Sequence, residues 1–266
     1  MLPSTFQLIN YTLILILLVL FFRYLWIVFI VRDHLPVQWQ FATKNGRISP
    51  RLKRLEKNYP DKVRFFNWWF QVERLNREEI PGVFIELGVY QGGSAKIIHH
   101  LDPERPFHLF DTFTGFTSED LHMETGDAAT YTPDNFADTN VETVLRNIAG
   151  ERRTAVRLNT AVRLNKSAVH FNNIIIHQGH FPESAIGFNE QVAMVNLDAD
   201  LYKPTKAGLE FFYPRLAPGG VILVHDYNHK WPGILKAVDD FVQTIPESLV
   251  ILPDIDGTVM IIRNKK

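Results

Sequence analysis

Five polar residues each stand at or just beyond the end of an apolar, strand-like run. They are Glu86, Asp111, Gln178, Asp198 and Asp226. In an open α/β sheet, the carboxyl ends of the parallel strands form one edge, and ligands bind at that edge. Packing alone does not explain a polar residue at each of these positions. We therefore expect the five side chains to converge on one binding site.

Asp198 and Asp226 are expected to be the reactive pair. Two carboxylates from neighbouring strands can hold an octahedral divalent cation, usually Mg²⁺, together with water and substrate oxygens. Such an ion lowers the pKa of a bound hydroxyl group, and a carboxylate can then remove its proton. Asp200 is expected to cap a helix or to hydrogen-bond loop amides instead. For His225 three roles stay open, namely a metal ligand, a base or a histidine at the rim of the site.

The segment from Val83 to Ile98 is expected to carry the first ligand loop. It begins with an apolar, β-favouring run and continues through Gly88, Gly92 and Gly93, which permit a tight turn. Ser94 is a suitable N-cap for the apolar helix that follows. A strand, a glycine-rich turn and a helix in this order are typical of the loop where an open α/β sheet binds its ligand.

The spacing of the glycines bears on the identity of the ligand. A dinucleotide loop reads G-x-G-x-x-G, and its middle glycine lets the backbone approach the pyrophosphate. Tyr90 occupies that position, which disfavours a nicotinamide cofactor. The pattern E-x-G-x-x-x-G instead resembles that of Rossmann-like methyltransferases. Their cofactor, S-adenosylmethionine (SAM), carries an ammonium and a sulfonium group, which suits a carboxylate such as Glu86. Asp111 follows at about the spacing of an acid that binds ribose hydroxyls.

Seven strands are predicted to alternate with helices. They are Val83–Ile85, Phe107–Phe110, Ile174–Ile176, Val192–Leu197, Val221–Val224, Leu249–Leu252 and Thr258–Ile262. This order predicts an α/β fold with a doubly wound, mostly parallel seven-stranded sheet, in which the closing hairpin adds one antiparallel strand. A helix over residues 61–79 carries an aromatic stripe and is expected to pack on the sheet.

Two further segments have no expected catalytic group. The loop at residues 113–116 is expected to cover the ligand, and residues 117–137 are polar and turn-rich, as in a lid or substrate loop. The hexapeptide T-A-V-R-L-N occurs at residues 154–159 and again at 160–165. A six-residue duplication preserves strand alternation but rotates a helix face, so we interpret it as an extended insertion.

Residues 11–31 form a nearly unbroken apolar run in which Arg23 is the only charged residue. A run of this length can cross a bilayer as a helix, and its apolar residues outweigh the cost of one arginine. A cleaved signal peptide and a buried core helix are weaker interpretations. Basic residues follow the run and none precedes it, which predicts a cytoplasmic catalytic domain. We expect an anchor at 1–33, a linker or membrane-surface segment at 34–60 and the catalytic domain at 61–266.

Composition narrows the functional class. The chain has 266 residues, a formal net charge of −1 and no cysteine. It therefore has no global basic field for nucleic acid, no disulfide bonds and no thiolate metal site. A homodimer is also considered.

Several motifs in order resemble those of the macrocin O-methyltransferase family. They are E-L-G-V-Y-Q-G-G-S at 86–94, F-D-T-F-T-G-F at 110–116, G-H-F-P-E-S at 179–184, L-D-A-D-L-Y at 197–202 and P-G-G-V-I-L-V-H-D-Y at 218–227. The resemblance covers roughly residues 62–263. It implies a SAM-dependent, Mg²⁺-assisted enzyme that acts on sugar hydroxyls of natural products. The family usually has two acids before the tyrosine of the last motif, where this chain has His225 and Asp226.

The resemblance implies that Glu86, Gly88 and Asp111 bind SAM and that Asp198 is a metal ligand and the catalytic base. Asp226 also carries over from the family pattern, whereas His225 does not. From the residues and the resemblance together, the expected metal ligands are Asp198, His225 and Asp226. The cofactor-binding positions are expected to be Glu86, Gly88, Tyr90, Gly92, Ser94, Asp111, Thr112, Phe113, Gln178 and Gly179.

The predicted function is a membrane-anchored, single-pass O-methyltransferase that uses SAM and a divalent cation. Its acceptor would be a sugar hydroxyl on a glycan, a glycolipid or other lipid-linked acceptor, or a glycosylated natural product. The two alternatives are a nicotinamide-dependent oxidoreductase and a membrane-tethered SAM-binding scaffold without turnover.

Overall fold

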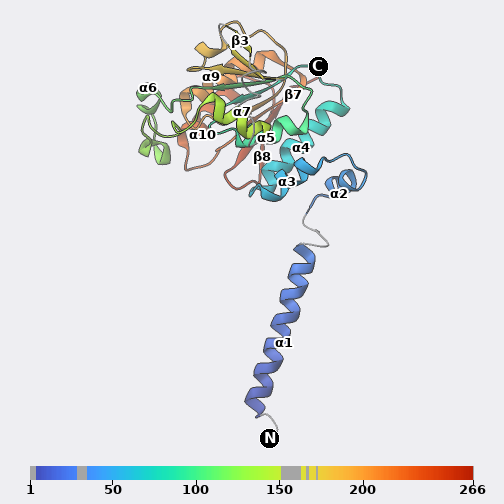
Figure 1. Cartoon of the computed structure of the whole chain (residues 1–266). Helices are drawn as coiled ribbons and strands as arrows, with labels where there is room; N and C mark the ends of the chain where they lie inside the picture. The colour runs from blue at the N-terminus through green and yellow to red at the C-terminus, as the bar shows by residue number, and fades with distance from the viewer. Residues whose placement is uncertain (1–3, 29–34, 151–162, 166–167, 172, 266) are drawn as a thin grey trace. The chain divides into compact units, whose positions relative to one another are not determined.

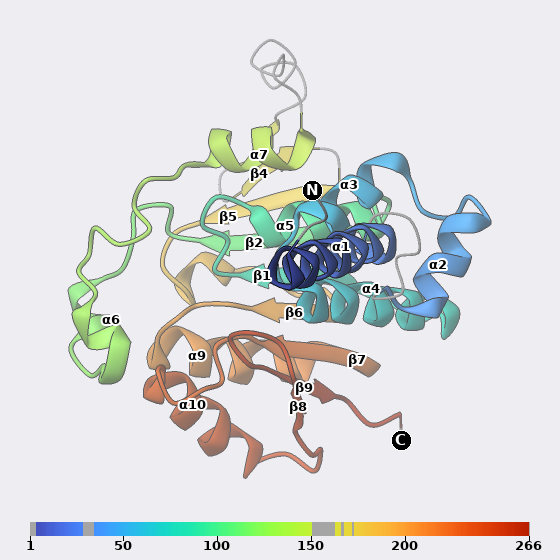
Figure 2. The ribbon, with the colours of Figure 1, turned by 90° about the horizontal axis from the view of Figure 1, so that it is seen from below.

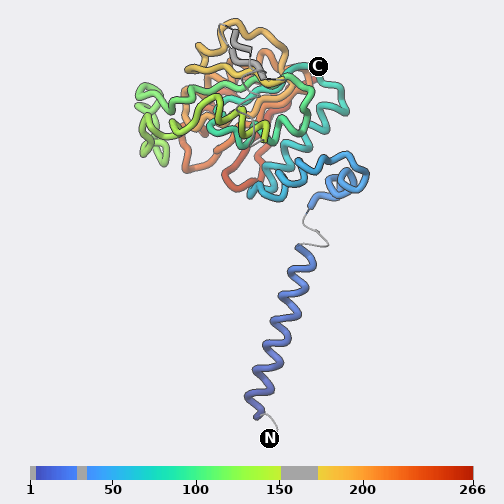
Figure 3. The backbone as a smooth tube through the Cα atoms, viewed as in Figure 1, coloured from blue at the N-terminus to red at the C-terminus, as the bar shows by residue number. Residues whose placement is uncertain are grey.

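The computed structural model describes residues 4–28, 35–150, 163–165, 168–171 and 173–265, and the remaining residues are grey in Figure 3. The chain divides into two compact units, residues 1–53 and 54–266. The boundary falls inside a helix, α3, which spans Pro50–Asn58. The two units are described separately below.

The first unit contains the helices α1, Thr5–Trp26, and α2, Val37–Lys44 (Figure 1). Helix α1 begins with a capping box in which Ser4 and Gln7 exchange side-chain and backbone hydrogen bonds. Its mean hydropathy is 2.2, and none of its residues is buried. Among the described residues it is the one helix long and apolar enough to cross a bilayer. Residues 34–60, expected to form a linker, contain helices α2 and α3.

The second unit is built on a sheet with the strand order β3-β4-β5-β2-β1-β6-β7-β9-β8. The strands are β1 Val83–Leu87, β2 Phe107–Asp111, β3 Arg163–Asn165, β4 Ala168–Phe171, β5 Ile174–Gln178, β6 Val192–Leu197, β7 Leu216–Val224, β8 Val250–Leu252 and β9 Thr258–Ile262. Strands β5, β2, β1, β6 and β7 run parallel, and β9 is antiparallel to both β7 and β8. The seven predicted strands and their one antiparallel member are confirmed.

Strands β3 and β4 extend this sheet as a hairpin that the sequence did not predict. Strand β4 pairs antiparallel with the edge strand β5 and β3 pairs antiparallel with β4. Most of the hexapeptide repeat lies outside the described residues. Its last three residues, Arg163–Asn165, form β3.

Helices cover both faces of the sheet, as the doubly wound prediction requires (Figure 2). Helices α4 Lys62–Arg77, α5 Gly93–Leu101 and α7 Val141–Ala149 lie on one face, and α9 Tyr202–Phe212 and α10 Pro232–Val242 lie on the other. The short helices are α6 Ser118–Leu121, η2 Gly126–Thr130, η3 Glu183–Ala185 and η4 Tyr213–Arg215.

The predicted aromatic stripe of α4 packs onto the sheet. Phe65 is fully buried and Trp68 is 1% exposed. The indole Nε1 of Trp68 donates a hydrogen bond to Oδ1 of Asn196 on β6 at 3.0 Å. Truncating such a buried indole typically costs about 3–5 kcal/mol of stability. This contact fixes the N-terminal half of α4 beside the end of β6.

Candidate active site

A cavity of about 580 Å³ opens at the carboxyl ends of the central strands. Most predicted site residues line it: Gly88, Tyr90, Ser94, Asp111, Thr112, Gly179, Asp198, His225 and Asp226. The predicted positions that do not line it are Glu86, Gly92, Phe113 and Gln178. Asp111, Asp198 and Asp226 therefore meet at one edge of the sheet as expected, and Glu86 lies directly beneath it. Gln178 is exposed.

Glu86 lies beneath the glycine loop and does not face the cavity. It is fully buried. Its Oε1 accepts hydrogen bonds from the Ser94 hydroxyl at 2.5 Å and from Nδ2 of Asn196 at 2.9 Å. Burial raises the pKa of Glu86 to about 8, and its Oε2 has no hydrogen-bond partner among the described residues. Helix α5 begins at Gly93, so its N-cap is Gly92, with φ 78°, and not Ser94 as predicted.

Asp111 holds the glycine loop in place through backbone groups. Its Oδ2 accepts from the amides of Val89 at 2.6 Å and Tyr90 at 2.9 Å, and its Oδ1 accepts from the amide of Phe113 at 2.7 Å. Asp111 also lines the cavity. Gly88 has a φ of 85°, and a Cβ there would collide with the carbonyl oxygen of Asp198. Packing against β6 therefore requires glycine at this position.

Asp198 is the centre of a charged cluster. Its Oδ2 lies 2.7 Å from Nη2 of Arg64, and its Oδ1 lies 3.1 Å from Nδ1 of His225. The same His225 nitrogen lies 3.1 Å from Oδ2 of Asp226. Burial opposes ionisation of Asp198, but the positive charges of Arg64 and His225 outweigh it and hold its pKa well below its usual range. Burial likewise opposes charging of His225, but Asp198 and Asp226 raise its pKa to about 10.

Arg64 was missed by the sequence analysis. It lies in the first turn of α4, where its guanidinium packs over the Trp68 ring at 4.9 Å. Its backbone amide donates to Asp61, the N-cap of α4, at 2.9 Å, and the other carboxylate oxygen of Asp61 accepts from the amide of Ile255 at 2.8 Å. Arg64 stands four residues before Trp68 on the inward face of the helix, and a cation on that apolar face was the available signal.

Asp200 joins the charged cluster and does not cap a helix. No side chain of its own segment caps α9, whose N-cap is Leu201. Instead, the amide of Tyr202 donates to Glu124 at 2.7 Å. Asp200 has a φ of 59° and lines the cavity. Burial and the neighbouring carboxylates of Asp198 and Asp226 raise its pKa well above its usual value. The expectation of a capping role was wrong.

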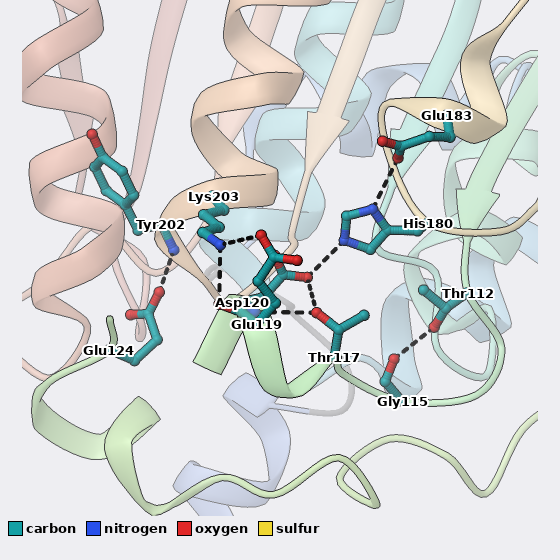
Figure 4. A network of polar contacts seen from close by, with 10 residues as sticks. All are labelled: Thr112, Gly115, Thr117, Glu119, Asp120, Glu124, His180, Glu183, Tyr202 and Lys203. Atoms are coloured by element: carbon teal, nitrogen blue, oxygen red, sulfur yellow. Dashed lines mark hydrogen bonds and ion pairs between the residues drawn. The ribbon is translucent and has the colours of Figure 1, made fainter. Parts of the chain in front are cut away.

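The segment predicted as a lid forms part of the cavity wall and is bound to the body of the unit (Figure 4). Asp120 of α6 accepts from the Thr117 hydroxyl at 2.7 Å and lies 2.7 Å from Nε2 of His180. Nδ1 of His180 lies 2.9 Å from Glu183. Close by, Nζ of Lys203 lies 3.0 Å from a carboxylate oxygen of Glu119, on the lid. The lid is therefore held by charged contacts on several sides.

The three predicted metal ligands have a spacing suited to one ion. Asp198, His225 and Asp226 form a group whose ligand atoms all lie within 4.8 Å of one another. The two 3.1 Å separations resemble those between adjacent ligands of an octahedral ion with bonds of about 2.1 Å. The donor set therefore fits a divalent cation, which would replace the proton that His225 shares with the two carboxylates.

The sheet order, the single antiparallel strand among the seven and the cavity beside the glycine loop define the fold of Rossmann-like, SAM-dependent methyltransferases. Residues 61–263 match the macrocin-O-methyltransferase (TylF) family. The chain belongs to this family.

Two characterised relatives act on glycosylated natural products. The 8-demethyl-8-(2,3-dimethoxy-alpha-L-rhamnosyl)-tetracenomycin-C 4'-O-methyltransferase of Streptomyces olivaceus is 27% identical over 177 residues, covering 62% of this chain and 60% of that protein. The mycinamicin III 3''-O-methyltransferase of Micromonospora griseorubida is 26% identical over 166 residues, covering 59% of each. The chain thus spans about three fifths of the length of these relatives.

Solved structures agree on the fold. The O-methyltransferase NovP has a TM-score of 0.59 at 24% identity, over 76% of this chain and 80% of that one. The calicheamicin methyltransferase CalS11 has a TM-score of 0.54 at 23% identity, over 80% of this chain and 90% of that one.

Proposed function

We propose that this chain is a SAM-dependent O-methyltransferase that methylates a sugar hydroxyl of a glycosylated acceptor. The observation that carries the proposal is Asp198, an ionised carboxylate held from two sides inside the cavity next to the glycine loop. Both relatives are O-methyltransferases of natural products, and the substrate of the first carries a rhamnosyl group, which supports a sugar hydroxyl as the acceptor group.

The loop has the features that the cofactor requires. Gly93 lines the cavity, and a Cβ there would meet nothing within 4 Å, so the backbone leaves open space for a ligand. The neighbouring carboxylate of Asp111 offers acceptors for ribose hydroxyls. SAM would supply an electrophilic methyl group. We assign its contacts to Gly88, Tyr90, Ser94, Asp111, Thr112 and Gly179, with Glu86 supporting the loop from below.

The proposed reaction also uses a divalent cation held by Asp198, His225 and Asp226. Such an ion would make a bound hydroxyl group more acidic. This assistance matters because a carboxylate whose pKa is far below its usual range is a weak base. Mg²⁺ is the ion that the family resemblance implies. The nitrogen ligand, His225, favours a softer ion than a carboxylate at the same position would.

The protein's own residues then orient the acceptor. Asp198 Oδ1 accepts the hydrogen bond of the acceptor hydroxyl and takes its proton as the methyl group is transferred, while Arg64 holds Oδ2 in place. Phe116 of the loop at residues 113–116 and Tyr131 of the lid, whose rings stack at 5.4 Å, line the cavity and exclude water from it.

The two alternative functions differ in what they bind and turn over. Calorimetry on the full chain should show binding of SAM and of its demethylated product with micromolar-class affinity. Tight binding of NAD without binding of SAM would favour an oxidoreductase. Binding of SAM without methyl transfer to any hydroxyl acceptor would favour a scaffold.

We further propose that α1 spans a membrane and that the catalytic unit lies on the cytoplasmic side. The length and apolarity of α1 and the basic residues that follow it support this topology. A glycolipid or another lipid-linked glycan is then a suitable acceptor, because confinement to one surface raises the effective concentration of both partners. Protease protection in vesicles tests the topology. Protection of the catalytic unit in cytoplasm-out vesicles would refute it.

A further inference from the structure

Helix α2 has an apolar outer face that an ordinary surface helix does not have. Its inward side chains, Trp39 and Ala42, are each 1% exposed. On the outside, Val37 is 76% exposed and Phe41 is 64% exposed. These two residues are four positions apart and therefore share one stripe of the helix. The outer stripe of a solvated helix is normally polar.

The same segment carries concentrated positive charge. Lys44 lies one turn beyond Phe41 on the stripe, and Arg47, Arg51 and Lys53 follow it. Residues 35–53 contain no acidic residue, although the whole chain has a net charge of −1. An exposed apolar stripe bordered by basic side chains is the pattern of a helix that lies in the interface of an anionic bilayer.

We propose that α2 is a second membrane contact, which lies flat on an anionic lipid surface with Val37 and Phe41 among the acyl chains. The basic residues at 44–53 pair with lipid phosphates. The proposal rests on the membrane span assigned to α1, because an anchor at residues 5–26 keeps α2 close to the bilayer. Such a contact would restrict how the catalytic unit meets an acceptor at the surface.

The absence of cysteine from the chain permits a direct test. The full-length Phe41→Cys variant, labelled with nitrobenzoxadiazole, is reconstituted into vesicles of phosphatidylcholine with or without phosphatidylglycerol. We expect a blue-shifted emission and strong quenching by a spin-labelled lipid when phosphatidylglycerol is present. Both signals should be lost in pure phosphatidylcholine and when Lys44, Arg47, Arg51 and Lys53 are all changed to Gln.

The matched control is Ile186→Cys, which labels an equally apolar side chain, 81% exposed, in the catalytic unit. Its dye should stay in water in both lipids. The proposal is overturned if the dye at position 41 stays in water while the protein floats with the vesicles, a result that leaves the anchor and the methyltransferase assignment intact. A blue shift of equal size in pure phosphatidylcholine also overturns it. Efficient disulfide cross-linking between two copies of the unlabelled Phe41→Cys variant overturns it as well, because a second copy would then be the occupant.

Discussion

Nη2 of Arg64, in the first turn of α4, lies 2.7 Å from Oδ2 of Asp198, which follows strand β6. The arginine therefore occupies one carboxylate oxygen and leaves the other, Oδ1, directed at His225. This contact orients Asp198 and keeps it ionised in a mostly buried site. Arg64 is thus a positioning residue for the proposed base.

Replacing Arg64 with Gln should lower kcat by roughly 10- to 100-fold, which corresponds to the loss of one charge-assisted hydrogen bond. The affinity for SAM should change little, because Arg64 contacts Asp198 and not the glycine loop. Added guanidinium should restore part of the rate. The matched control is Arg74→Gln on the same helix, which removes an ion pair with Glu78 away from the cavity. An unchanged kcat in a folded Arg64→Gln variant would remove Arg64 from the account.

Two glycines of the ligand loop should respond differently to the same substitution. Gly88→Ala places a Cβ against the carbonyl oxygen of Asp198 at a φ of 85°, so the thermal midpoint should fall by several degrees. Gly93→Ala meets nothing within 4 Å and should keep the thermal midpoint. Its methyl group enters the cavity wall, so SAM affinity should fall instead. Thermal melts measure the stability of each variant, and calorimetry measures its affinity for SAM. Equal stability of the two variants would contradict the packing role of Gly88.

His225→Asp restores the acid pair that is usual in the family. If His225 Nδ1 is a ligand, this change should shift the metal preference toward Mg²⁺, because magnesium prefers oxygen to nitrogen. Titrations of Mg²⁺ and Mn²⁺ into wild type and variant, followed by heat, provide the readout. An identical metal profile in both proteins would place His225 outside the coordination sphere.

The link between the lid and the body should weaken as the pH rises. Burial lowers the pKa of His180, but Glu183 and Asp120 outweigh it and raise the pKa above its ordinary value of about 6.5. The contact is therefore complete below about pH 6.5 and is lost as the pH rises through the higher pKa of the folded state. The rate of proteolysis within residues 117–137 should increase over that range.

His180→Asn should abolish this pH dependence. Lys203→Gln, which removes the contact with Glu119 but no group titrating in that range, should raise the proteolysis rate and keep its pH dependence. A wild-type rate that is flat with pH would show that His180 does not hold the lid.

Local patterns predicted much of this fold and part of the site. Apolar runs such as Val192–Leu197 are bounded by turn residues, which is why the seven strands and their order of alternation were predictable. Asp198 and Asp226 were predictable because strand ends of a parallel sheet meet at one edge. The hairpin β3–β4 was not, because its short strands depend on pairing with the edge of β5.

Long-range pairing explains the errors at the site. Arg64 and Asp198 are 134 residues apart, and no local pattern joins them. Ser94 has the chemistry of an N-cap, but its hydroxyl bonds Glu86 and Gly92 takes the capping position. Asp200 was expected to act as a cap, but the amide at the start of α9 bonds the carboxylate of Glu124, which lies in the lid and is distant in sequence.

The most direct test is methyl transfer by the full-length protein in vesicles. Wild-type protein, methyl-tritiated SAM and a panel of glycosylated acceptors should give label on a sugar hydroxyl. Asp198→Asn is nearly isosteric and removes only charge and basicity, so it should lower the rate by about 10²- to 10⁴-fold while binding SAM as wild type does. Transfer at the wild-type rate by Asp198→Asn, or SAM binding by wild type with no label on any hydroxyl acceptor, would contradict the account.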